Sequence, residues 1–196
     1  MTRAIPRELK EALTEKLAES LAGPLPEATP RRVYGTVALP GKVSAVIGMR
    51  RAGKTTFLHQ LRRERLERGT PREHLPYVNF EDERFAGLEA GQLGFLVEEH
   101  GRRFPEARAR ATVIWCFDEI QVVPGWERFV RRLLDAGGCE VIVTGSSAAL
   151  LSREIATALR GRAWEVPLYP FSFAEALRHR GQAIPADSAF LTGEER

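Results

Sequence analysis

The sequence predicts a three-layer α/β/α fold with a parallel sheet of about five strands. Short apolar runs alternate with segments of helical periodicity along the 196-residue chain, and such alternation is typical of parallel strands joined by helical crossovers. Apolar residues make up 43% of the chain, enough for a core that covers both faces of a sheet. Because ligands of such sheets bind beyond the carboxyl ends of the strands, we expect the functional site at that edge.

The first element expected is an amphipathic helix over residues 8–21, because leucine recurs there at four-residue spacing. Glycine and proline break the pattern between Gly23 and Pro30. We therefore expect an N-terminal helix and linker over residues 1–30, a core domain over 31–170, and the start of a C-terminal region over 171–196.

Strands and helices then alternate through the core. Strands are expected over residues 43–47, 77–80, 113–117, 140–144 and 163–168, where apolar residues form short runs. Helices are expected over residues 54–68, 88–104, 126–136 and 148–159. A last helix is expected after Ser172, because Glu175 completes a capping box there. The ends of the first four strands, at residues 47, 80, 117 and 144, should carry the chemistry.

The loop after the first strand, Gly48 to Thr55, fits the pattern G-x-x-x-x-G-K-[ST] at every fixed position. Such a P-loop turns its backbone N–H groups toward phosphates, and glycine permits the backbone angles that this needs. We expect Lys54 to contact the β- and γ-phosphates and the hydroxyl of Thr55 to ligate Mg²⁺. Thr56 is either a contact to the α-phosphate or an ordinary helix residue. The expected nucleotide-binding residues are Gly48, Arg50, Arg51, Ala52, Gly53, Lys54, Thr55 and Thr56.

An acidic pair, Asp118 and Glu119, follows the third apolar run, as in the Walker B pattern of several apolar residues followed by an acid. Asp118 is expected to hold Mg²⁺ directly or through water, and Glu119 to activate the attacking water. Successive side chains of a strand point to opposite sides, so two neighbouring acids can have two roles. The alternatives are a turn residue for Asp118 and a solvated loop charge for Glu119.

Polar residues also mark the end of the fourth strand, at Thr144 and Ser146. In P-loop proteins that use a strand-borne glutamate, a polar residue at this place senses the γ-phosphate, and both residues are candidates. The alternative for Ser146 is the N-cap of the helix that follows. ATP is favoured over GTP, because the chain has no N-K-x-D motif for reading guanine.

The charge pattern does not by itself indicate nucleic acid. The net charge is only +3. The arginines between Arg62 and Arg68 are interleaved with glutamates, which favours a solvated helix with ion pairs over a phosphate-binding surface. The sequence therefore gives no support for nucleic acid as a partner. The charged N-terminus, the lack of an apolar stretch of membrane length and two cysteines suited to a reducing compartment predict the cytoplasm and no membrane.

In these motifs the sequence resembles the prokaryotic AAA-type ATP-binding proteins, relatives of the archaeal ATPases and the STAND signalling ATPases, which commonly carry a C-terminal region of unknown function. The matching stretches are residues 5–8, 48–56, 117–121, 124–126, 144–147, 159–162 and 168–173. The resemblance implies an ATPase core, and it implies that Arg160 or Arg162 is the sensing arginine, acting within the chain or on a neighbouring subunit of a homo-oligomer. The alternative is a pair of surface arginines that cap a helix.

Proteins of this kind usually continue well past the motif at residues 168–173, so we expect the chain to be a fragment of a longer protein or a truncated product. Two functions remain open. The first is Mg²⁺-dependent hydrolysis of ATP, and the second is a nucleotide-gated switch that binds ATP with little or no turnover. A small-molecule kinase is disfavoured by the acidic pair and the later arginines. The candidate catalytic residues are Lys54, Glu119, Thr144, Ser146, Arg160 and Arg162.

Overall fold

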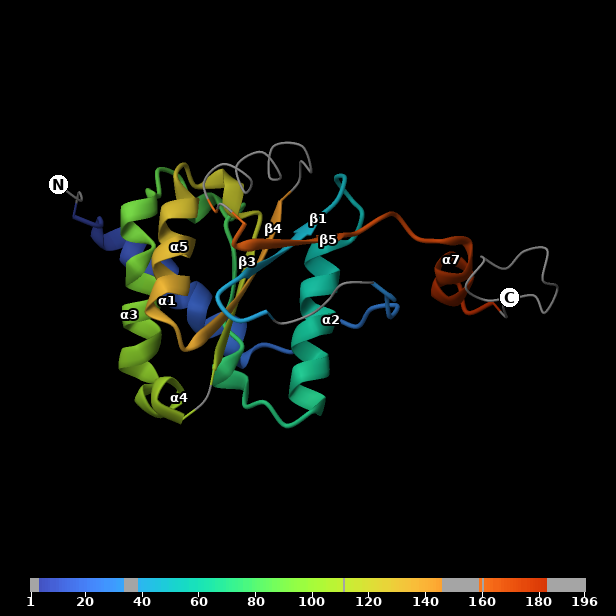
Figure 1. Ribbon diagram of the computed structural model, residues 1–196, viewed down its shortest axis with the longest axis horizontal. Coiled ribbons are helices and arrows are strands. Elements are labelled where there is room, and N and C mark those ends of the chain that lie inside the picture. Colours follow the sequence, from blue (N-terminus) through green and yellow to red (C-terminus); the bar gives the residue numbers. More distant parts are fainter. Residues whose placement is uncertain (1–3, 34–38, 111, 146–158, 160, 183–196) are drawn as a thin grey trace.

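A parallel sheet lies between two layers of helices in the computed structural model (Figure 1), which describes residues 4–33, 39–110, 112–145, 159 and 161–182. The strands are β1 (Val43–Ile47), β2 (Tyr77–Asn79), β3 (Val113–Asp118), β4 (Cys139–Gly145) and β5 (Ala163–Pro167). The α-helices are α1 (Arg7–Ala22), α2 (Lys54–Glu67), α3 (Gly94–Arg103), α4 (Pro105–Arg110), α5 (Trp126–Ala136) and α7 (Phe173–His179). Single 3₁₀ turns are η1 (Arg72–His74), η2 (Glu83–Phe85), η3 (Ala90–Gln92) and η4 (Ile120–Val122).

The strands lie in the order β2-β3-β4-β1-β5, and every pairing is parallel. Strand β4 therefore separates β1 from β3. The register places Ile47 beside Gly145 and Phe117 beside Val143, so β1, β4 and β3 end next to one another at the same edge. Residues that follow β1 and β3 thus flank the end of β4, and the predicted parallel sheet is confirmed.

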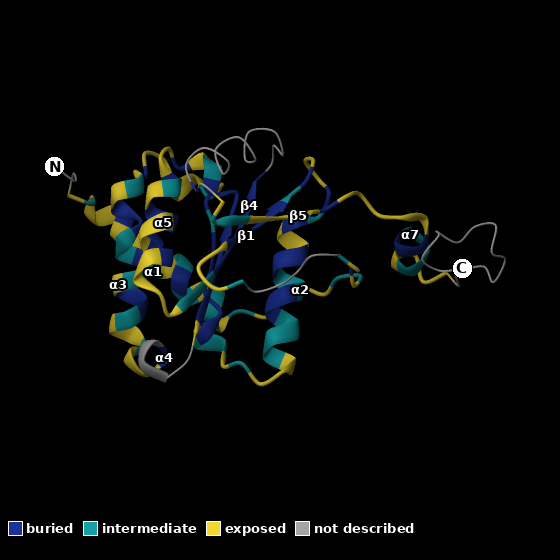
Figure 2. Cartoon of the chain, in the orientation of Figure 1, coloured by how far each residue is buried: buried dark blue, intermediate teal, exposed yellow. Residues whose placement is uncertain are grey.

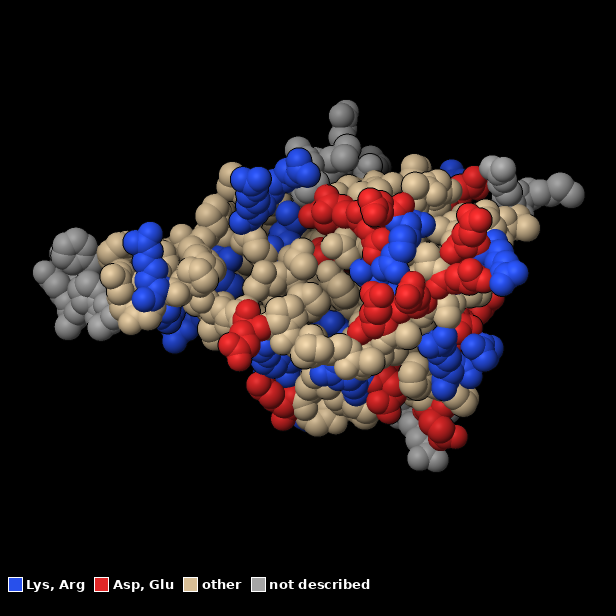
Figure 3. Space-filling view, turned by 180° about the vertical axis from the view of Figure 1, so that it is seen from behind, with Lys and Arg blue, Asp and Glu red and all other residues tan. Residues whose placement is uncertain are grey.

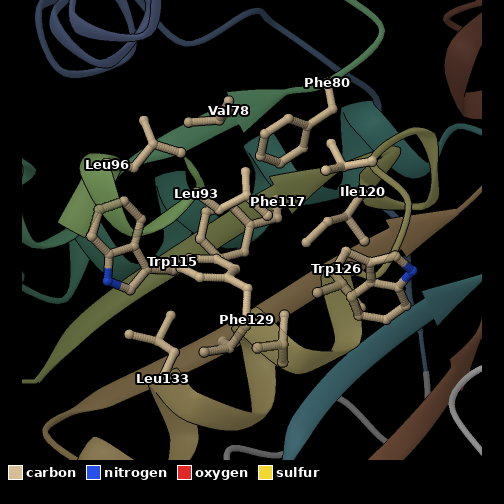
Figure 4. Close-up of a cluster of buried hydrophobic side chains, with 14 of the residues drawn as sticks. Val78, Phe80, Leu93, Leu96, Trp115, Phe117, Ile120, Trp126, Phe129 and Leu133 are labelled. Atoms are coloured by element: carbon tan, nitrogen blue, oxygen red, sulfur yellow. The ribbon is translucent and has the colours of Figure 1, made fainter. Parts of the chain in front are cut away.

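Alternation along β3 divides the core between the two faces of the sheet. Val113, Trp115 and Phe117 pack among the helices α1, α3 and α5, whereas Ile114 and Cys116 pack under α2, as expected for side chains that alternate along a strand. Phe117 meets Phe129 edge-on with ring centroids 5.6 Å apart, and it stacks on Trp115 at 5.5 Å. Figure 4 shows these aromatic rings together, and Figure 2 shows that the central strands β1 and β4 are mostly buried, whereas β5 is largely exposed.

Helix α2 is fixed to its surroundings by a buried arginine. Arg62 is only 3% exposed. Its guanidinium donates to the carbonyl oxygens of Leu75 (3.1 Å) and Ser20 (2.5 Å), and it lies over the ring of Tyr77. Burial lowers the pKa of Arg62. The prediction of a solvated helix with ion pairs is therefore wrong for this residue, because carbonyl groups from other segments replace water around the charge.

The neighbouring arginines of α2 also turn toward the protein. Arg63 donates to the carbonyl of Leu25, and Arg65 lies 3.2 Å from the carboxylate of Glu140. On the face drawn in Figure 3, acidic and basic side chains are interspersed. These observations give a phosphate backbone no continuous basic surface on that face.

Most predicted elements agree with the structure within one or two residues, including the capping box of Ser172 and Glu175. The helix predicted over residues 88–104 is wrong at its start, because Glu89 and Gln92 cap a separate 3₁₀ turn before α3 begins at Gly94. Helix α4 was not predicted. The helix predicted over residues 148–159 lies almost entirely outside the described residues. Within the described part of the chain, no helix has the length and apolar character needed to cross a membrane.

Candidate functional site

The loop between β1 and α2 is tightly constrained at both ends. At its start, a Cβ on Gly48 would lie 2.3 Å from the carbonyl oxygen of Leu168, so only glycine fits against this main chain. At its end, Gly53 has a φ of +91° and forms the N-cap of α2. Between them, Arg51 also has a positive φ, and the N–H of Ala52 donates to the carbonyl of Met49. The loop therefore folds back on itself and leads directly into the N-terminus of α2.

The ammonium group of Lys54 lies inside this loop. Lys54 is the first residue of α2 and is 5% exposed. Its Nζ donates to the carbonyl oxygens of Gly48 (3.3 Å) and Met49 (3.2 Å) and lies 3.5 Å from Oε1 of Glu119. The buried cation thus joins the loop after β1 to the residue that follows β3.

The other predicted loop residues differ in exposure. Ala52 is buried. Arg50 and Arg51 are exposed, as are Thr55 and Thr56 in the first turn of α2. The first turn of any helix leaves backbone N–H groups without intrahelical partners and carries partial positive charge. This part of the loop can therefore receive an anion from solvent.

The carboxylate of Asp118 is the most deeply buried acidic group of the site. It is fully buried at the end of β3. The hydroxyl of Tyr77 donates to its Oδ2 at 2.8 Å, and the hydroxyl of Thr144 donates to its Oδ1. Burial, followed by the nearby Asp118 charge, raises the pKa of Tyr77, so the phenol stays protonated and able to donate. Two hydroxyl donors thus satisfy a buried negative charge.

Glu119, the residue that follows β3, has an unusual backbone conformation. Its φ is +51°, a left-handed conformation that costs about 1–2 kcal/mol for a residue with a side chain. Its N–H donates to Oγ1 of Thr144 at 2.9 Å, and its Oε2 accepts from Nε2 of Gln121 at 2.6 Å. Thr144 therefore contacts both acids at once, because β4 lies beside β3 in the sheet.

The structure brings together Gly48, Lys54, Asp118, Glu119 and Thr144. These residues lie at the carboxyl ends of the parallel strands, where the sequence predicts the functional site. Ser146 and Arg160 lie outside the described residues. Arg162 lies at the opposite edge of the sheet, since its carbonyl accepts from the N–H of Val43 at the start of β1, and its guanidinium pairs with Asp135. The structure therefore does not bring Arg162 to the P-loop of its own chain.

Three further residues at the site were not anticipated as site residues. Tyr77 and Gln121 bind the two acids. Arg31 is buried behind the P-loop and donates to the carbonyl of Ala52. Tyr77 and Arg31 reach the site through contacts between distant segments, whereas Gln121 lies only two residues after Glu119.

Comparison with known proteins finds relatives that match most of this chain. An uncharacterized protein of Methanocaldococcus jannaschii is 38% identical over 142 residues, which cover 72% of this chain and 30% of the relative. An uncharacterized protein of Haemophilus influenzae is 35% identical over 136 residues, covering 69% of this chain and 33% of the relative. The chain thus spans about a third of the length of the curated relatives that it matches.

Among solved structures, PCH-2 of C. elegans aligns with 91% of this chain and 48% of its own, at 14% identity and a TM-score of 0.44. The family model of an AAA domain matches residues 40–177, a range that runs from just before β1 into α7 and includes the P-loop, the acidic pair and Thr144. The chain therefore belongs to the AAA domain family of P-loop proteins.

Proposed function

We propose that this chain binds ATP with Mg²⁺ at residues 48–56 and hydrolyses it, with Glu119 as the general base. The observation that carries the proposal is the 3.5 Å approach of Lys54 Nζ to Glu119 Oε1. The cation of a phosphate-binding loop and an acid from a different strand meet at one point. That arrangement supports the proposal, because Glu119 would then be a proton acceptor beside the position expected for the terminal phosphate.

Phosphate binding would use groups that the loop already orients. Lys54 contacts two carbonyl oxygens and one carboxylate, and phosphate oxygens would compete for the same ammonium protons. The helix N-terminus at Gly53 adds backbone N–H groups and a favourable dipole. Exposed Arg50 and Arg51 lie on the same loop and would add positive charge near its entrance.

The residues fit a magnesium ion that is held mainly by phosphates and water. The described residues contain no cluster of three or more His, Cys, Asp or Glu placed to hold a metal. Thr55 offers an exposed hydroxyl, and Asp118 offers a carboxylate whose two oxygens already accept hydrogen bonds. Mg²⁺ commonly takes few protein ligands beside nucleotide phosphates. Thr55 would ligate the ion and Asp118 would act through water, while the ion would neutralise phosphate charge.

Hydrolysis would depend on the position of Glu119. Thr144 holds its backbone and Gln121 holds its carboxylate. Strained backbone conformations of this kind concentrate at functional sites, which supports a catalytic use of Glu119. Ser146 is proposed as a second γ-phosphate contact. Arg160 or Arg162 would act on a neighbouring copy, and the place of Arg162 at the far edge of the sheet favours action between subunits.

One observation favours a second function, a nucleotide-gated switch with little turnover. The carboxylate of Glu119 is engaged by both Lys54 and Gln121. A general base held in this way must be released before it can accept a proton from water. If ATP binding does not release it, the chain would bind ATP and report its presence without hydrolysis.

A calorimetric titration with ATP, with and without Mg²⁺, tests the proposal on the wild type and on Lys54→Ala. The substitution removes the buried cation of the loop, and charge-assisted hydrogen bonds contribute about 1.5–3 kcal/mol, so affinity should fall at least tenfold. Release of phosphate from ATP, measured across protein concentrations, separates the enzyme from the switch. Equal ATP affinity in wild type and Lys54→Ala would refute nucleotide binding at this loop.

A further inference from the structure

Arg31 lies buried behind the P-loop and joins three segments of the chain. Its Nη1 donates to the carbonyl of Ala52 at 3.0 Å, its Nη2 to the carbonyl of Tyr169 at 2.7 Å, and its Nε to Oε1 of Glu175 at 2.7 Å. The guanidinium also stacks over the ring of Phe171, 4.8 Å from its centroid. A planar group with five donors suits such a junction, whereas a lysine cannot reach all three acceptors in fixed directions.

The contact with Ala52 bears directly on phosphate binding. The carbonyl of Ala52 and the N–H of Gly53 belong to one planar trans peptide, so they point in opposite directions. Arg31 donates to this carbonyl, so the Gly53 N–H points away from the guanidinium. At a φ of +91°, Gly53 has no side chain that limits rotation of this peptide. The contact with Arg31 therefore helps to keep its orientation.

The segment after β5 supports the loop at both ends. The N–H of Leu168 donates to the carbonyl of Ile47 at 2.7 Å, and its own carbonyl lies against Gly48. The next residue, Tyr169, accepts from Arg31, which holds the far end of the loop. The backbone of Arg31 is itself fixed to α2, since it exchanges two hydrogen bonds with the side chain of Gln60.

Glu175 connects this assembly to α7. Its Oε1 accepts from Arg31, and its Oε2 accepts from the N–H and hydroxyl of Ser172 at the N-cap of the helix. Both members of the ion pair are buried, with side chains 6% and 7% exposed. The same carboxylate thus caps α7 and orients the guanidinium that holds the P-loop. A second contact, between Thr29 and His179, fixes the other end of α7.

We propose that Arg31 is a positioning residue for the P-loop and that Glu175 couples the placement of α7 to nucleotide binding. The inference rests on the proposed function, because it concerns the same phosphate site. Coupling is reciprocal: if a docked α7 favours the binding conformation of the loop, nucleotide binding must in turn stabilise the docking of α7.

Two variants test the inference while keeping the residues that are predicted to contact the nucleotide. Arg31→Lys keeps the positive charge but loses the planar guanidinium with its donors in fixed directions. The ATP affinity of this variant should fall about tenfold. Glu175→Gln keeps the shape of the side chain and loses its charge. The matched control is Arg65→Lys, which alters an ion pair with Glu140 toward the far end of α2 and should leave ATP affinity unchanged. Circular dichroism and thermal melts establish that each variant is folded at the titration temperature.

Hydrogen exchange of residues 173–180 provides a readout that a purely structural ion pair would not move. ATP should slow exchange of these amides in the wild type and have little effect on them in Glu175→Gln. Lys54→Ala is measured in parallel, and its unchanged affinity would count against the proposed function rather than against Arg31. Weak binding by Lys54→Ala together with wild-type affinity in Arg31→Lys would overturn the inference. So would equal losses in Arg31→Lys and Arg65→Lys, or exchange in α7 that ATP does not alter in the wild type.

Discussion

Lys54 and Glu119 form a buried ion pair across the candidate site, with Nζ and Oε1 3.5 Å apart and side chains only 4% and 9% exposed. The sequence predicts Lys54 as a phosphate contact and Glu119 as the residue that activates the attacking water. If the loop binds phosphate as proposed, phosphate and glutamate would compete for the same ammonium group. Binding and hydrolysis should therefore respond in opposite directions to loss of the carboxylate charge.

Glu119→Gln tests this relationship. The amide keeps the shape of the side chain but cannot accept a proton from water, and general-base catalysis typically contributes about 10²–10⁴-fold. Phosphate release should fall by about that factor, while ATP affinity should equal or exceed that of the wild type. Measurable turnover that is the same in both proteins would exclude Glu119 as the base. ATP binding without turnover in either protein would favour the switch.

Asp118→Asn should weaken ATP binding in the presence of Mg²⁺ more than in its absence, because it removes negative charge from the surroundings of the ion. The side chain is fully buried and accepts two hydrogen bonds, so a modest loss of stability should accompany the change. Titrations below the melting temperature of both proteins separate the two effects. An equal loss of affinity with and without Mg²⁺ would make Asp118 a structural residue.

Thr144→Val should lower turnover more than Tyr77→Phe. Both changes remove one hydroxyl donor from the buried Asp118 carboxylate, at a cost of about 1–3 kcal/mol in the free energy of unfolding. Only Thr144 also holds the N–H of Glu119. Urea unfolding and phosphate release, measured on both variants, form a matched comparison. Equal effects on turnover would show that Thr144 supports Asp118 alone.

Acid should destabilise the fold partly through Glu99. Its hydrogen bond from Arg102 lowers its pKa from 4.5 to about 2, aided by Arg103 and opposed by burial. A lowered pKa in the folded state contributes stability that is present above about pH 4.5 and is lost as the pH falls toward 2. Between pH 5 and 2.5 the free energy of unfolding should therefore fall more in wild type than in Glu99→Gln. Parallel urea denaturation curves at both pH values measure this, and identical losses would contradict it.

The residues at the ends of strands could be predicted because their placement follows from the fold class alone. Once β1 and β3 are strands of one parallel sheet, Gly48 and Asp118 must lie at the same edge. Tyr77 could not be predicted in this way. Its contact with Asp118 depends on the register of β2 on β3, which places Asn79 beside Asp118.

Arg31 and Arg62 show a second reason why part of the structure could not be predicted from the sequence. Charged residues in polar surroundings normally indicate a solvated surface. Both are instead buried, because carbonyl groups from distant segments surround them: Arg31 reaches Ala52 and Tyr169, and Arg62 reaches Leu75. Such acceptors belong to the main chain and leave no trace in side-chain type, so only the assembled structure reveals them.

The anchoring of Arg62 restricts how α2 can move. Lys54 begins this helix, and Arg62 lies about 12 Å further along its axis at a rise of 1.5 Å per residue. Since Arg62 is bound to the main chain of two other segments, sliding of α2 along its axis would break both of these hydrogen bonds. Between Lys54 and Arg62 the helix is held as well, because Phe57 and Leu58 are buried in the core and Gln60 is bound to the backbone of Arg31.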